Sequence, residues 1–440
     1  MADRAHLAHL LRRATFGPTA EEVDAAERAG VEATRAALLR PSGVDAGARA
    51  TPPPASGADP YAAITRDSTR EERQKARQER QKQLQATIHW WVDRMVAADH
   101  QLTEKLVFFW HGHWATSARK VRSARLMLAQ QQAFRDYGRG DFGALAAAMV
   151  RDPALIVWLD GQRNTRTAPN ENLARELMEL FTLGIGNYTE ADVKEGARAL
   201  TGWTVDRATG AARFVPRRHD DGAKTILGTT GALGAAAYAD LLVRQPANAA
   251  FLAARLWFRF ASGEPPPPPA AQRLTAAYGA GRDVTALLGA LLADPEFAGT
   301  AGQLVKQPVE WAVGAMRQLG IRPSALPEQQ RKQLLGGLGG LDQVPLRPPS
   351  VGGWPAGAAW LTTSSLQVRL RMADLLAARA AAPVVDRVAA APKAGRVEAL
   401  GRLLVVDAWT DRTRKVLAGA AGQPRRLIAL GLASPEYTVH

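Results

Sequence analysis

Two histidines separated by a single residue, His111 and His113, stand out in a chain of 440 residues that contains eight histidines. Two other segments are also rich in groups that do chemistry: an acidic stretch at 170–184 and the pair His219 and Asp220. Imidazole and carboxylate groups bind first-row divalent metals and transfer protons near neutral pH. The sequence therefore predicts a reaction centre built from these three segments.

The leading hypothesis is a metal-dependent enzyme with a mononuclear or dinuclear site. The candidate metal ligands carry imidazole or carboxylate groups, and they are His111, His113, Glu171, His219 and Asp220. The catalytic candidates would move a proton or hold an anionic group, and they are Glu176, Glu179, Arg175 and Lys224. A carboxylate outside the ligand set would act as general base on a metal-bound water. Zinc or manganese would support hydrolysis and iron or copper oxidation, and this mixture of ligands does not distinguish them. Axial ligation of haem by one histidine is a lesser alternative.

The two histidines can share one ion only if the helix that carries them ends early. On a straight helix, residues two apart point about 200° away from each other. We expect convergence only if the helix ends near Trp110, and Gly112 favours such a break because glycine is costly inside helices. Otherwise one histidine binds the ion, and the other is a hydrogen-bonded residue of the core.

The acidic stretch and the His219 segment also have simpler interpretations. Glu171, Arg175 and Glu179 are spaced four apart, so they could form surface ion pairs that contribute a few tenths of a kcal/mol each. Asp220 could orient His219 instead of binding the metal. The segment around Lys224 could equally be a turn with a solvated lysine.

Composition limits the remaining function classes. The chain has no cysteine, which excludes disulfides, thiolate zinc sites, iron–sulfur clusters and cysteine nucleophiles. The net charge is +14, but the basic residues are spread along the chain and no nucleic-acid-binding motif is present, so we expect no specific nucleic-acid binding. We also expect no membrane span and, without a signal-peptide pattern, a cytoplasmic location unless a partner carries the protein out. A glycine-rich stretch at 337–341 follows no strand, so it does not fit a dinucleotide-binding loop.

The predicted helices must position these groups. Apolar residues recur at helical spacing along most of the chain, and only 212–218 and 224–231 are strand-like. The sequence therefore predicts a mostly α, multi-helix globular fold with at most a short β-hairpin. Residues 1–60 would form N-terminal helices and a Pro/Gly-rich connection, and 61–440 the main all-helical domain, unless 1–440 is one domain.

Several segments resemble a large bacterial family known as domain of unknown function 1800. They are found at 9–19, 108–117, 159–203, 219–228, 306–320, 344–361 and 428–437. The resemblance implies a sulfatase-like companion protein that carries export signals. Where this chain has Gly112, the family more often has asparagine. The resemblance also leaves a competing hypothesis, a non-catalytic helical partner or escort, in which the loop carrying Trp354 and Trp360 would anchor the interface.

Overall fold

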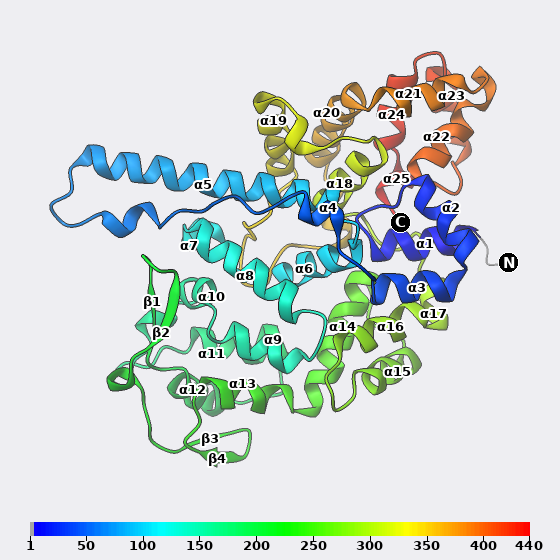
Figure 1. Cartoon of the computed structure of the whole chain (residues 1–440). Helices are drawn as coiled ribbons and strands as arrows, with labels where there is room; N and C mark the ends of the chain where they lie inside the picture. The colour runs from blue at the N-terminus through cyan, green and yellow to red at the C-terminus, as the bar shows by residue number, and fades with distance from the viewer. Residues whose placement is uncertain (1–3) are drawn as a thin grey trace.

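The structure, a computed structural model, describes residues 4–440 and is built almost entirely of helices (Figure 1). The first part contains α1 (Arg4–Ala14), α2 (Ala20–Ala29), α3 (Val31–Leu39), α4 (Ala46–Arg49), η1 (Pro60–Ala63), α5 (Arg70–Ala97), α6 (Gln101–His113), α7 (Ala118–Val121), α8 (Ala124–Tyr137), α9 (Phe142–Met149) and α10 (Pro153–Trp158). The middle contains η2 (Gly161–Arg163), α11 (Asn172–Glu176), η3 (Leu177–Thr182), α12 (Glu190–Ala199), β1 (Trp203–Asp206), β2 (Ala211–Phe214), η4 (Pro216–Arg218), β3 (Lys224–Ile226) and β4 (Thr229–Gly231). The last part contains α13 (Ala235–Val243), α14 (Pro246–Phe260), α15 (Pro268–Tyr278), α16 (Val284–Ala293), α17 (Pro295–Ala298), α18 (Pro308–Gln318), η5 (Pro323–Ala325), α19 (Glu328–Gly340), η6 (Gly357–Trp360), α20 (Thr363–Arg379), α21 (Ala382–Ala390), η7 (Lys393–Gly395), α22 (Arg396–Leu404), α23 (Asp411–Ala420), α24 (Pro424–Leu432) and α25 (Pro435–Thr438).

Local sequence signals begin several of these helices. Thr19, Thr69 and Thr189 each accept a hydrogen bond from the backbone three residues on, and the acidic residue there bonds back to the threonine backbone. This reciprocal arrangement is the capping box, and it satisfies two backbone donors that a helix start leaves free. The mostly α fold predicted from the helical periodicity is confirmed.

Helix α6 lies at the centre of the molecule. Apart from Thr103 and Gly112, every residue of this helix is buried, including the charged Glu104 and Lys105. A helix that is buried on all sides belongs to the interior of a large core. One hydrophobic cluster surrounds α6 and includes Leu10 and Phe16 from the N-terminal region. The division of the chain at residue 60 stays a prediction.

The strand-like segments fold differently from the expected single hairpin. β2 pairs with β1, and β3 pairs with β4, so the chain has two separate antiparallel hairpins. Both lie at one edge of the molecule, the β1–β2 hairpin beside α10 and the β3–β4 hairpin beside α12 (Figure 1). The sequence did not predict β1, the partner of β2, which follows α12 after a short turn. Within residues 4–440, no helix is long and apolar enough to cross a bilayer.

Candidate functional site

His111 is a fully buried residue of the α6 core. Its Nε2 accepts a hydrogen bond of 3.1 Å from the backbone N–H of Leu346. Its ring packs edge-on against Trp91 and Trp354, with centroids 5.2 and 5.3 Å away. Because Nε2 is the acceptor, the proton sits on Nδ1. Burial lowers the pKa of His111 to about 3, so the ring is neutral at physiological pH.

His113 lies on the same helix but bonds a different part of the molecule. Its Nε2 donates to the carbonyl oxygen of Phe181 at 2.9 Å, at the end of η3. Nδ1 therefore keeps a lone pair, and no protein atom among the described residues bonds to it. Burial, assisted by the nearby charge of Arg255, lowers the pKa of His113 to about 3. Helix α6 continues to His113, so the early helix end on which convergence of the two histidines depended does not occur.

The acidic segment contains a π-helix. α11 ends at Glu176, and η3 continues with wider turns, as in the bond from Leu183 N to Met178 O at 2.9 Å. Such a turn rotates the residues after it relative to those before it. Glu179 lies within this π-helical part, and Arg175 pairs with Glu171 and Glu190 rather than with Glu179.

The charged side chains of this segment are already paired. Arg175 bonds Glu171 at 3.1 Å and Glu190 at 2.7 Å. Glu179 accepts a bond of 2.7 Å from the Tyr188 hydroxyl, and burial together with this bond raises the pKa of Tyr188 to about 12. The remaining carboxyl group, that of Glu176, is half-buried, and burial followed by repulsion from Glu179 raises its pKa.

His219, Asp220 and Lys224 form a closed loop beside α12. His219 Nδ1 lies 3.0 Å from both oxygens of Thr201, whose hydroxyl also receives the backbone N–H of Asp220 at 2.8 Å. The Asp220 carboxylate binds Arg198 at 2.7 Å. The buried Lys224 donates to the Asp220 and Gly222 carbonyl oxygens at 2.6 and 2.8 Å. These contacts hold the loop in place and use two of the three N–H donors of Lys224.

The structure keeps the three predicted segments largely apart. Each of the carboxylates Glu171, Glu179 and Asp220 bonds a neighbour in its own region, and His113 meets the acidic segment at the backbone and the ring of Phe181 rather than at a carboxylate. Residues 4–440 contain no group of three or more His, Asp or Glu placed to hold a metal ion. The metal site, with zinc, iron, manganese, copper or haem as its cofactor, stays a prediction.

A cavity of about 100 Å³ lies next to His113, between α6, α14, α18 and the loop that carries Trp354. This volume is several times what one water needs and suits a small polyatomic ion. Phe108, Phe109 and Trp354 form an aromatic wall, and Trp354 stacks on Phe108 with centroids 5.9 Å apart. The indole N–H of Trp354 is buried, and among the described residues it has no hydrogen-bond partner.

Glu310 is the acidic centre of this region. Its Oε1 lies 3.2 Å from Lys105 Nζ and 3.1 Å from Arg259 Nη2, and its Oε2 accepts from the backbone N–H of Gln307. Lys105 also donates to the carbonyl oxygen of Thr15 at 2.6 Å. Burial opposes ionisation of Glu310, but Arg259 and Lys105 prevail and lower its pKa. This carboxylate is therefore ionised and compensates two neighbouring cations.

The other cations of the region have no carboxylate of their own. Arg255 lines the cavity one helical turn before Arg259, and within residues 4–440 it forms no ion pair. Lys306 is buried, with Nζ 3.6 Å from the centre of the Tyr437 ring. The buried Arg13 donates to the Thr300 carbonyl oxygen at 2.6 Å. Burial lowers the pKa of each of these three cations. Since buried charges are normally compensated, the region is short of negative charge.

Reading the sequence did not identify this cationic pocket. Lys105 carries a charged group, yet only 2% of its surface is exposed. A usable signal was the spacing of Arg255 and Arg259, four residues apart in a helix that is otherwise mostly apolar. The residues that surround the pocket's cations come from α1, α6 and α18, which are far apart in the sequence. No local pattern predicts such contacts.

The comparison with protein families fits the extent of this fold. Residues 9–439 match the family described as "Protein of unknown function (DUF1800)". The chain belongs to this family. The match extends from α1 to the residue after α25, so the three helices that line the pocket, α6, α14 and α18, lie within the family's fold. Neither the curated proteins nor the solved structures include a match.

Proposed function

We propose that this DUF1800 protein binds a ligand through an anionic group, phosphate, sulfate or carboxylate, in the pocket beside Arg255 and His113. The observation that carries the proposal is the excess of cations around the cavity. Glu310 compensates Lys105 and Arg259, but Arg255 faces the cavity without a carboxylate among the described residues. A planar guanidinium presents donors that match the oxygens of such anions.

The neighbouring groups support the same ligand chemistry. A bound anion would stabilise the charged guanidinium of Arg255, whose pKa burial lowers. The aromatic wall at Phe108 and Trp354 offers contact to an apolar or ring-shaped part of the same ligand. His113 Nδ1 adds a neutral acceptor for a ligand hydroxyl.

Thermal unfolding in the presence of sulfate or phosphate tests this proposal. At constant ionic strength, we expect the unfolding temperature to rise with anion concentration and to saturate, since a ligand that binds only the folded state adds about 2.7 kcal/mol at a hundred times its Kd. Arg255→Gln should abolish the saturable part. Arg244→Gln is the matched control, because Arg244, at the C-terminal end of the preceding helix α13, is 65% exposed and paired with Asp240. An equal rise in the wild type and in Arg255→Gln would reject the pocket as the binding site.

A further inference from the structure

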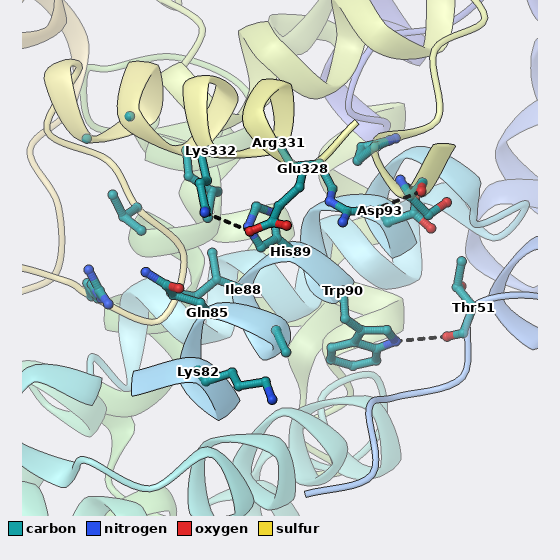
Figure 2. A pocket seen from close by; sticks show the side chains of 18 of the residues that line it. Thr51, Lys82, Gln85, Ile88, His89, Trp90, Asp93, Glu328, Arg331 and Lys332 are labelled. Carbon is teal, nitrogen blue, oxygen red and sulfur yellow. Dashed lines mark hydrogen bonds and ion pairs between the residues drawn. The ribbon is translucent and has the colours of Figure 1, made fainter. Parts of the chain in front are cut away.

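A second and larger cavity lies between α5 and α19 (Figure 2). Its volume is about 780 Å³, and it is open to solvent along one side. Figure 2 shows His89 of α5 beside Glu328 and Lys332 of α19, with Gln85 and Lys82 farther along α5 and Lys82 on the side of the pocket away from α19. Between its outermost lining residues on α5, eleven positions apart, the groove runs roughly 16 Å at 1.5 Å per residue.

The groove carries positive charge that its own carboxylates do not neutralise. Asp93 is bound by Arg322 at 2.8 Å, outside the lining, and Glu328 is bound by Lys332 at 2.7 Å. Arg331 donates to a backbone carbonyl, and the half-buried Arg347 forms no ion pair within residues 4–440. Burial, followed by repulsion from Arg119, lowers the pKa of Arg347. The free charge at the groove is therefore cationic.

Four glycines of α19 divide into two pairs with different surroundings. Gly337 and Gly340 face α20, where an added Cβ would meet Met372 and Val368. Gly336 and Gly339 line the groove, and nothing lies within 4 Å of an added Cβ at Gly336. A glycine inside a helix destabilises the helix by about 1 kcal/mol relative to alanine. Close packing against α20 accounts for glycine at Gly337 and Gly340, but not at the two positions that line the groove. On the groove side, the missing side chains leave room for another backbone to approach closely.

We propose that this groove binds an acidic segment of a partner polypeptide in extended form. A groove of roughly 16 Å accommodates about five residues of extended chain at 3.3 Å each. Acidic side chains would meet Lys82, Arg331 and Arg347, and the backbone would pass over Gly336. The half-buried His89 and the buried Ile88 provide an apolar floor for side chains between the acidic ones.

Fluorescence anisotropy with a labelled peptide of about eight alternating Glu and Leu residues tests the proposal on the full chain. We expect binding that the Gln/Leu counterpart does not show. Arg331→Gln/Arg347→Gln should weaken it at least about tenfold, which is 1.4 kcal/mol. Gly336→Leu, which favours the helix but fills the groove, should weaken it similarly. Arg412→Gln/Lys415→Gln, on α23, is the control of equal charge and should bind as the wild type does.

Three results would overturn the proposal. One is the absence of binding to the acidic peptide at millimolar concentration. Another is equal weakening in the α23 control, which would indicate attraction to the net charge alone. The third is full competition by inorganic pyrophosphate at an affinity equal to that of the peptide, which would make the groove a site for small polyanions. Arg255→Gln should leave peptide binding unchanged, so this result is independent of the pocket beside His113.

Discussion

The acidic segment and the cationic pocket both gather charged side chains, but they differ in how these charges are compensated. In the acidic segment, Arg175 lies between Glu171 and Glu190, and all three are at least one third exposed. In the pocket, Lys105 and Arg259 share the carboxylate of Glu310, whose side chain is 4% exposed. The comparison teaches that the type and spacing of residues alone do not identify a site. The informative feature is a buried charged side chain with too few oppositely charged partners to compensate it.

Removal of the Glu310 charge should have the largest effect. Glu310→Gln keeps the size of the side chain and an oxygen that can cap α18, but leaves Lys105 and Arg259 buried without a counter-charge. Breaking a buried pair in this way typically costs about 3–5 kcal/mol. Denaturant unfolding followed by circular dichroism measures the loss. The control Glu398→Gln removes a pair with Arg414 in which both side chains are about half-exposed, and it should change stability by less than about 1 kcal/mol. Equal losses in the two variants would contradict the account.

Acid should destabilise the protein through its buried histidines. Burial lowers the pKa of His9, His111 and His113 from 6.5 to about 3. Because the folded state holds these rings neutral, their contribution is complete above pH 6.5 and is lost as the pH falls toward 3. Each ring contributes a slope of up to about 1.4 kcal/mol per pH unit in that range.

His113→Gln isolates one of these contributions. The glutamine amide can still donate to the Phe181 carbonyl oxygen but does not titrate. Urea midpoints at pH 7 and pH 5 should therefore differ less in this variant than in the wild type, whereas Lys415→Gln should show the wild-type difference. An unchanged pH dependence in His113→Gln would show that this ring is accessible to protons in the folded state.

Substitution in the acidic segment should have a small effect. Arg175→Gln removes bonds to Glu171 and Glu190 at the surface. Exposed pairs contribute about 0.2–1 kcal/mol, so the unfolding midpoint should shift only slightly, and sulfate binding should be unaffected. A loss of sulfate binding in this variant would move the functional site back to the acidic segment.

Substitution of a predicted metal ligand should have the smallest effect of all, on the metal content of protein purified without chelators. His111 and His113 both use Nε2 on the backbone, so we expect far less than one metal ion per chain, with no change in His219→Ala. Elemental analysis measures this directly. Near-stoichiometric metal that disappears in His219→Ala would instead support the metal-dependent enzyme.

Hydrophobic periodicity in the sequence predicted the mostly α fold, because periodicity acts within a few positions of the chain. The π-helix at 177–182 was not predicted, since it depends on contacts of its final carbonyl groups with His113 and Asn248, from other helices. The ion pair between Lys105 and Glu310, about two hundred positions apart in the sequence, could not be predicted for the same reason. Burial of a charge depends on such long-range contacts, which is why the pocket emerged only from the structure.

The most direct test of the central claim is anomalous diffraction from crystals of the full chain, grown without sulfate or phosphate and then soaked in sodium tungstate. The account predicts an anomalous peak in the cavity beside His113, within hydrogen-bond distance of the Arg255 guanidinium. At saturating tungstate, an empty cavity with peaks only at exposed lysines and arginines would contradict it.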